Sequence, residues 1–226
     1  MTSFAPVIHE VPLESLNDVF SHEELFDFGR RMNDQKPNIL PEWAGEIVRF
    51  SPKDGREARE REMILALIAQ YGDAILSREN DFAHMTASSI IVSPDRKRTL
   101  MAFHRIYNSW AWTGGHADGE SDFEAIARRE AQEETGITNL ARLGGGPASI
   151  EILPVWAHVK RGKHVGSHLH LNVSYLFEAD ESLPLRVAQD ENSAVGWIEV
   201  DKLREKVSEP PMLPIYERLL NRANDW

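Results

Sequence analysis

The feature that most constrains the fold is a group of strand-like runs arranged on both sides of one short helix. Strand-like texture covers four runs: Met85 to Val92, Thr99 to Trp112, Ile150 to Val159 and His168 to Phe177. A Pro94-Asp95 turn joins the first two runs, and a basic loop from Lys160 to Lys163 separates the last two. Strands on both sides of a central helix, with more helices around them, predict an α+β fold whose mixed sheet is covered on both faces.

The N-terminal third has a different texture. Leu13 to Met32 reads as weakly patterned helix, and Arg56 to Ser77 reads as an amphipathic helix after a stretch rich in Pro and Gly. Periodicity changes near Asp81 without a visible linker. We therefore predict a helical N-terminal extension at residues 1–80 and a catalytic domain at residues 81–226, which ends in a helix containing Ile215, Leu219 and Leu220.

Composition excludes several functional classes. The 226 residues include no cysteine, so the chain has no disulfide, no thiolate nucleophile and no cysteine-ligated zinc. A formal charge of −11 argues against a nonspecific grip on long nucleic acid, which needs clustered Lys and Arg. No run approaches the roughly 18 apolar residues of a membrane helix, and the first residues lack a basic segment followed by an apolar one. We expect a cytoplasmic protein without membrane contact.

A helix with clear limits lies in the middle of the chain. Ser121 to Glu124 form a capping-box sequence with Ser121 as the expected N-cap, and Gly136 supplies a left-handed stop. The inward face of this helix begins with apolar residues, Phe123, Ile126 and Ala127, and continues with Glu130 and Glu134. Glu133 lies at the edge of the same face. Three acids directed toward a sheet repel one another unless a cation compensates them.

A hard divalent cation would use such a cluster. Most glutamates on helices are simply solvated, but here Arg128 and Gln132 already occupy the outward face. Mg²⁺ prefers oxygen ligands and shares its coordination among carboxylates, waters and substrate phosphates. It also activates water, which permits hydrolysis of a phosphoanhydride without a covalent protein nucleophile.

Two segments together resemble the Nudix box: Gly115 to Glu120, and Arg129 to Ile137, which reads Arg-Glu-Ala-Gln-Glu-Glu-Thr-Gly-Ile. The resemblance implies an α/β/α sandwich around a mixed sheet, and hydrolysis of a nucleoside diphosphate linked to another moiety. It also implies that Mg²⁺ or Mn²⁺ binds to Glu130, Glu133 and Glu134. Arg129 would orient one glutamate by ion pairing, and Glu133 and Glu134 would take part in catalysis.

The first half of the box departs from the family pattern. The family spacing requires Glu at position 121, where this chain has Ser121, and Glu120 stands one residue early. We assign Glu120 provisionally to the metal site. Gly114 and Gly115 would let the backbone approach a substrate phosphate. Glu191 occupies the region where many Nudix proteins carry a further acid, and we predict a catalytic role for it.

Further polar residues are candidates for substrate binding. The period-two alternation of a strand places His168, His170, Asn172 and Ser174 on one face. Three interpretations are open for this face: a zinc site together with His164, a wall of the substrate pocket, or an ordinary solvated surface. Arg105 and Tyr107 could contact a nucleotide, whereas core burial is favoured for Trp112. We assign Arg105, His168 and His170 to substrate binding.

Competing functions follow from the same family resemblance. A Nudix domain that senses a nucleotide derivative and regulates a partner is the main alternative, although such domains often lack a box glutamate and this chain keeps all three. The related isopentenyl diphosphate isomerase uses a catalytic cysteine, which this chain lacks. The N-terminal extension could serve in homodimerisation or specificity.

Overall fold

The computed structural model describes residues 40–226, except residues 106–107, 161 and 189–191. The helix expected between Leu13 and Met32 lies outside the described residues. Residues Leu40–Trp226 form one compact unit. Whether residues 1–80 act as a separate extension stays a prediction.

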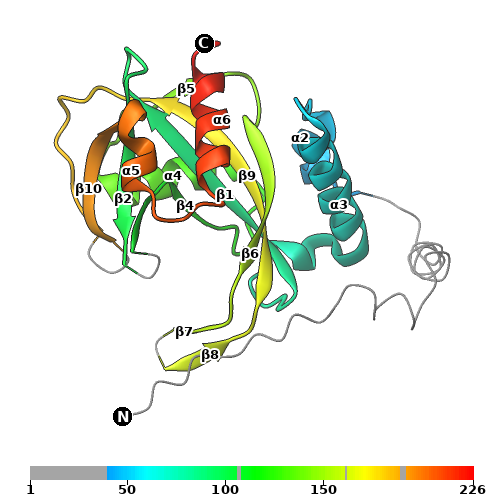
Figure 1. Cartoon of the computed structure of the whole chain (residues 1–226). Coiled ribbons are helices and arrows are strands. Elements are labelled where there is room, and N and C mark those ends of the chain that lie inside the picture. The colour runs from blue at the N-terminus through cyan, green and yellow to red at the C-terminus, as the bar shows by residue number, and fades with distance from the viewer. Residues whose placement is uncertain (1–39, 106–107, 161, 189–191) are drawn as a thin grey trace, which may run out of the picture. The chain divides into compact units, whose positions relative to one another are not determined.

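A mixed sheet organises this unit (Figure 1). Strand β1 (Ala83–Val92) lies at its centre, parallel to β9 (His168–Glu178) on one side and antiparallel to β2 (Arg98–His104) on the other. The other strands of this sheet pair with these three: β3 (Ser109–Ala111) and β10 (Asn192–Glu199) with β2, β4 (Thr113–His116) with β1, and β5 (Ala141–Leu143) and β6 (Ser149–Val155) with β9. The predicted mixed sheet is confirmed.

Helices cover both faces of the sheet, as Figure 1 shows. One core lies beneath α4 (Phe123–Thr135), α2 (Gly45–Arg49) and α3 (Gly55–Tyr71), and a second lies beneath α5 (Leu203–Lys206) and α6 (Leu213–Ala223). Short 3₁₀ turns are Glu42–Ala44, Gly72–Leu76 and Val200–Lys202. Every residue of β1 is buried, because β1 has a core on each side. The predicted α/β/α sandwich is confirmed.

Three predicted elements have different limits in the structure. The single strand expected from Thr99 to Trp112 is wrong, because the chain reverses after His104 and β3 pairs back onto β2. Asn108, with φ of 49°, lies in this reversal, and Asn tolerates left-handed backbone. Helix α3 stops at Tyr71 before Gly72, which has φ of 56°. The strand expected to run to Val159 divides into β6 and β7 (His158–Lys160), which pairs with β8 (Lys163–Val165).

Helix α4 begins one residue later than the capping box predicts. Its N-cap is Asp122, whose side chain accepts a hydrogen bond of 3.0 Å from the backbone N–H of Ala125. The assignment of Ser121 as N-cap is therefore wrong; adjacent Ser and Asp are both good caps, so the sequence alone left the start uncertain by one residue. Gly136 ends the helix in the left-handed conformation, with φ of 79°, as expected.

Buried ion pairs join α3 to α6 and to the sheet. Glu57 of α3 is fully buried and accepts hydrogen bonds of 2.7 and 2.8 Å from Arg222 of α6. The hydroxyl of Ser149 on β6 donates to the same carboxylate at 2.8 Å. Arg218, also on α6, lies 3.3 Å from Glu57 and 3.1 Å from the buried Glu151 of β6. Helix α3 is thus fixed at the β6 edge by charge as well as by apolar packing.

Candidate active site

Helix α4 presents its acids where the apolar stripe meets the sheet. Phe123, Ile126 and Ala127 are buried, and the same face continues to Glu134, which is only 9% exposed. Glu130 is half-buried and Glu133 is exposed. The three carboxylates therefore form a graded series from the protein interior to solvent, in the order that helical spacing predicts.

Glu134 is held by two donors from different strands. One carboxylate oxygen accepts from the backbone N–H of Gly114 on β4 at 2.9 Å, and the other accepts from Nδ2 of Asn192 on β10 at 2.7 Å. Hydrogen bonds to an ionised acceptor are short and strong, so these two fix the carboxylate against the sheet. Asn192, which is fully buried, was not singled out from the sequence. Its neighbour Glu191, the predicted catalytic acid, lies outside the described residues.

Glu130 lies directly against the backbone of β4. A Cβ atom added to Gly115 would stand 2.4 Å from Cδ of Glu130, and one added to Gly114 would stand 2.4 Å from Oγ of Ser88. No side chain fits at either position without displacing a neighbour. The glycines were predicted to admit a phosphate. In the structure Gly115 leaves space for the Glu130 carboxylate, and Gly114 leaves space for Ser88 of β1.

Glu120 and Arg129 are partners. Nη1 of Arg129 donates to the Glu120 carboxylate at 2.9 Å, while Nη2 lies 3.8 Å from Oε1 of Glu130. This hydrogen bond, with the charges of Glu120, Glu130 and Glu133, raises the pKa of the Arg129 guanidinium. The arginine thus lies between Glu120 of the loop and Glu130, the first of the three predicted metal ligands.

The loop that carries Glu120 is held by hydrogen bonds to residues that precede β1. The backbone N–H of Gly119 donates to the carbonyl of Leu76 at 3.1 Å, and Nε of Arg78 donates to the Asp118 carboxylate at 2.7 Å. Asp118 itself has left-handed backbone, with φ of 48°. Residues preceding the sheet therefore hold the loop that brings Glu120 to Arg129.

Among the predicted substrate contacts, Arg105 lies near the carboxylates. It is exposed, and its Nε donates to the backbone carbonyl of Asn192 at 3.2 Å, the residue whose side chain holds Glu134. Trp112 packs edge-on against Tyr216 of the second core, with ring centroids 5.4 Å apart, as expected. Tyr107 lies outside the described residues.

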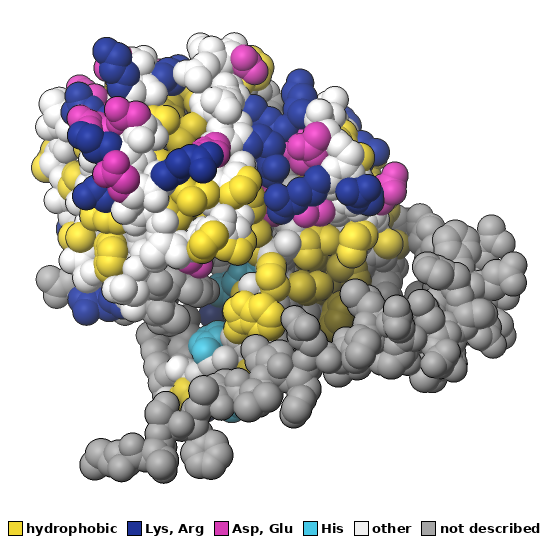
Figure 2. All heavy atoms as spheres, viewed as in Figure 1, with side chains coloured by type: hydrophobic (Ala, Val, Ile, Leu, Met, Phe, Trp, Pro, Cys, Tyr) yellow, Lys and Arg dark blue, Asp and Glu magenta, His cyan; other side chains and the backbone are white. Residues whose placement is uncertain are grey.

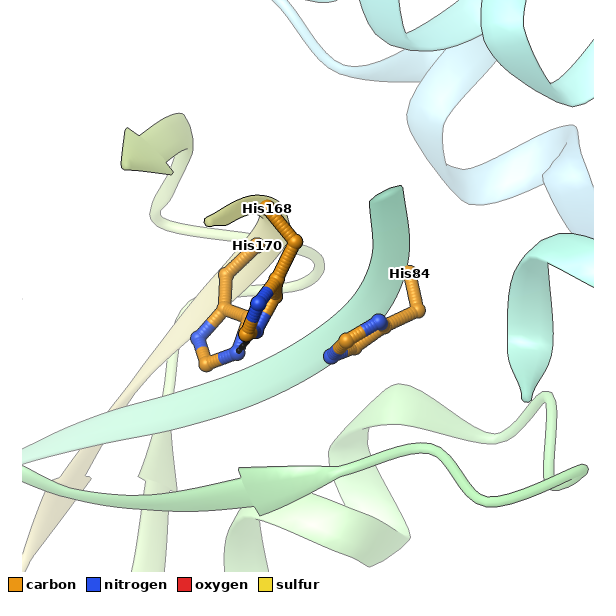
Figure 3. A group of neighbouring side chains, drawn as sticks. All are labelled: His84, His168 and His170. Carbon is orange, nitrogen blue, oxygen red and sulfur yellow. Dashed lines mark hydrogen bonds between the residues drawn. The ribbon is translucent and has the colours of Figure 1, made fainter. Parts of the chain in front are cut away.

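The histidines of β9 belong to a larger group. The interpretation of their strand face as solvated is wrong, because Asn172 and Ser174 of the same face are buried against β1 and β6. His84 of β1 is paired in register with His170, and its ring stacks on that of His168 with centroids 4.8 Å apart (Figure 3). His84 was not anticipated, because it is far from His168 in sequence.

Two histidines of this group have lowered pKa values. Burial, together with the neighbouring rings of His116, His84 and His168, lowers the pKa of His170 to about 2. Burial also lowers the pKa of His84. The ring of His116 lies 5.2 Å from that of His84 and 5.0 Å from that of His170. His116 directly follows Gly115, so β4 links this group to the carboxylates of α4.

The donor set of α4 fits a hard divalent cation. Glu130, Glu133 and Glu134 offer only carboxylate oxygens, which suit Mg²⁺ or Mn²⁺ better than softer metals. Glu120 reaches this set through Arg129, its partner at 2.9 Å, so a contribution to the metal's surroundings is indirect in this geometry.

Comparison with known families identifies the fold. The model of the NUDIX domain matches residues 83–219, which is more than half of the chain. The chain belongs to the Nudix hydrolase family. The match spans β1 to α6 and includes the whole Nudix box, whereas α2 and α3 precede it.

Several solved Nudix structures are similar to this chain at low sequence identity. An Ap4A hydrolase from C. elegans is 18% identical over 63% of this chain and 98% of its own, with a TM-score of 0.46. The dihydroneopterin triphosphate pyrophosphohydrolase of E. coli is 15% identical over 61% and 95%, with a TM-score of 0.46. The NUDIX domain of Shewanella oneidensis NrtR, complexed with ADP ribose, is 17% identical over 61% and 86%, with a TM-score of 0.42.

A comparison with curated proteins yields no significant match to this Nudix chain. Within the described residues, none of its helices combines the length and the apolar character needed to cross a membrane.

Proposed function

We propose that this Nudix protein hydrolyses a diphosphate linkage in a nucleoside diphosphate derivative, with Mg²⁺ or Mn²⁺ held by Glu130, Glu133 and Glu134. One observation carries the proposal: Glu130 and Glu134 continue the buried stripe of α4 and lie against the glycine backbone of β4, and the exposed Glu133 lies beside them on the same helix. Such a cluster is stable beside a sheet when a cation compensates its charge.

Each residue of the site has a distinct part in this proposal. When bound, the metal supplies neutralisation of phosphate charge and activation of water. Glu134 is preorganised by Gly114 and Asn192, so it keeps its position when substrate arrives. Glu133 is exposed to solvent, so its carboxylate is accessible to an incoming ligand.

Arg129 and Arg105 provide the positive charge of the site. Arg129, shared between Glu120 and Glu130, restrains the Glu130 carboxylate. Arg105 extends from the β2–β3 turn, where its guanidinium can pair with a phosphate while Nε stays on Asn192. Gly114 and Gly115 are our candidates for backbone contacts with a substrate phosphate, and Glu191 is our candidate for accepting the proton of the attacking water.

Metal removal tests the proposal directly. The full chain is treated with EDTA and assayed against a panel of nucleoside diphosphate derivatives, with the phosphate products identified. We expect EDTA to abolish hydrolysis, Mg²⁺ or Mn²⁺ to restore it and Zn²⁺ alone to leave it absent, because the α4 ligands are hard oxygens. Activity that survives EDTA would refute the metal role, and tight binding of a derivative without any product would indicate a sensing domain.

We also propose a homodimer in the cytoplasm as the working state. Light scattering on the full chain measures its mass in solution, and a mass of one chain across the assay concentrations would exclude the dimer.

A further inference from the structure

We infer that His84, His168 and His170 form a second metal site, separate from the carboxylates of α4, which takes Zn²⁺ through three imidazole nitrogens. One ring nitrogen from each residue lies within 4.8 Å of the others. Figure 3 shows the ring of His84 reaching from β1 toward the two rings of β9. Three neutral imidazoles with an open fourth position are a common zinc-binding set.

The tautomers of two rings leave lone pairs directed into the group. Nδ1 of His168 lies 2.9 Å from the carbonyl of Gly166, and Nδ1 of His84 lies 3.2 Å from the carbonyl of Asn80. A carbonyl only accepts, so each Nδ1 carries the proton and each Nε2 of the neutral ring carries a lone pair. Zinc-binding histidines are typically oriented by this kind of N–H contact with a backbone carbonyl.

His84 supplies an independent indication of a ligand. Its side chain is only 4% exposed, and its Nε2 has no hydrogen-bond partner within the described part of the chain. A buried acceptor that lacks a partner is costly, typically by about 1–3 kcal/mol. A metal ion between the rings would satisfy it.

The spacing of the rings agrees with a shared tetrahedral metal. Nε2 of His168 lies 3.2 Å from Nε2 of His170. Zinc–nitrogen bonds of about 2.0–2.1 Å place two ligands of a tetrahedral ion about 3.3 Å apart. His168 and His170 are both half-buried, so rotation of their rings can close the wider separation from His84.

Strand pairing fixes the backbone positions from which the three rings extend. His84 and His170 are opposite one another in the parallel pairing of β1 with β9, followed by Thr86 opposite Asn172. Asn172 accepts from Thr86 at 3.0 Å and donates to Glu151 at 3.2 Å, so the residues next to the rings are locked. His168 and His170 are only half-buried, so an ion can approach their rings from solvent, and Figure 2 shows histidine side chains at the surface of this face.

Zinc titration of the full chain tests the site apart from catalysis. The parent is a Glu130→Gln/Glu134→Gln variant, which removes two α4 carboxylates as competing ligands, and Zn²⁺ alone is added in a calorimeter. We expect one Zn²⁺ per chain and a rise in melting temperature with zinc, because a ligand that binds only the folded state stabilises it.

Histidine variants of the same parent identify the ligands. His168→Ala and His170→Gln should each weaken zinc binding at least tenfold, whereas His164→Ala, which removes an exposed imidazole from β8, should leave binding unchanged. Circular dichroism checks that each variant is folded, and the two variants at different strand positions test the site independently. Absence of zinc binding in the parent, or unchanged binding in folded His168→Ala and His170→Gln, would overturn the site. Neither result would affect the proposed Mg²⁺-dependent hydrolysis.

Discussion

At the scale of single residues, the site depends on which carboxylate oxygens are already engaged. Both oxygens of Glu134 accept protein hydrogen bonds, whereas Glu133 is open to solvent. A carboxylate fixed in advance would hold a metal ion in place without reorganising, and the ion would stabilise the charge that develops on the phosphate. We therefore expect kcat to fall when Glu134 is replaced, even by glutamine, which conserves the shape of the side chain.

Glu134→Gln should lower kcat about a hundredfold or more while the fold stays intact. Glutamine keeps the volume, but it loses the charge, and its NH₂ group cannot accept from Asn192 or Gly114. Steady-state kinetics at saturating Mg²⁺ measure the effect. Glu62→Gln, the same change at an exposed position of α3, is the control and should be silent. Wild-type kcat in Glu134→Gln would exclude the role.

Glu120→Gln should reduce turnover or the apparent affinity for Mg²⁺, with little change in melting temperature. Its carboxylate is half-exposed and pairs with Arg129, which lies beside Glu130, so loss of its charge frees the arginine to pull on the metal ligand. Metal titrations of activity and thermal melts separate the two effects. If the variant keeps the wild-type rate and metal dependence, the protein works with its helical acids alone.

At the scale of elements, the two ends of α4 have different roles: its N-terminus is stabilised by a cap, and its C-terminal half carries the predicted metal ligands. Its first turn is capped by Asp122 and its last turn carries the carboxylates, so the cap and the acids lie at opposite ends of one rigid rod. Strand β4 lies against the acidic end, with two glycines that let it approach closely. Stability and chemistry can therefore be perturbed separately in this helix.

Asp122→Ala should destabilise the chain by about 1 kcal/mol, because the cap on the Ala125 N–H is lost. Ser121→Ala, next to it, should change stability by no more than about 0.5 kcal/mol, since Ser121 is exposed and is not the cap. Urea denaturation of both variants measures the difference. The reverse order of the two effects would return the cap to Ser121.

At the scale of the whole molecule, elements outside the matched Nudix region are joined to it by charge. Glu57 of α3 and Arg222 of α6 both lie outside residues 83–219, and they meet over Ser149 of β6 within it. A buried ion pair of this kind adds little stability compared with an apolar contact of similar size. Removing one partner, however, leaves the other charge buried without compensation. Helix α3 and the C-terminal helix α6 should therefore unfold together with the sheet.

Glu57→Gln should destabilise the protein by about 3 kcal/mol or more, because Arg222 would stay largely buried without a counter-charge. Glu217→Gln is the matched control, since it breaks the exposed pair of Arg204 with Glu217, and it should cost less than about 1 kcal/mol. Equilibrium denaturation monitored by circular dichroism compares them. Equal losses of stability in the two variants would show that the buried α3–α6 ion pair contributes no more than the exposed one.

The sequence by itself determined the features that depend on local periodicity. A helix of 3.6 residues per turn puts Glu130 and Glu134 on one face whatever surrounds it, and Gly136 ends that helix because of its own backbone freedom. The tertiary structure alone decided which distant residues meet. Asn192 reaches Glu134 across 58 positions, and His84 faces His170 across 86, through strand pairings that local patterns do not encode. The physical reason is that strand register follows from burying whole faces of a sheet, so such contacts arise only when the complete chain has packed.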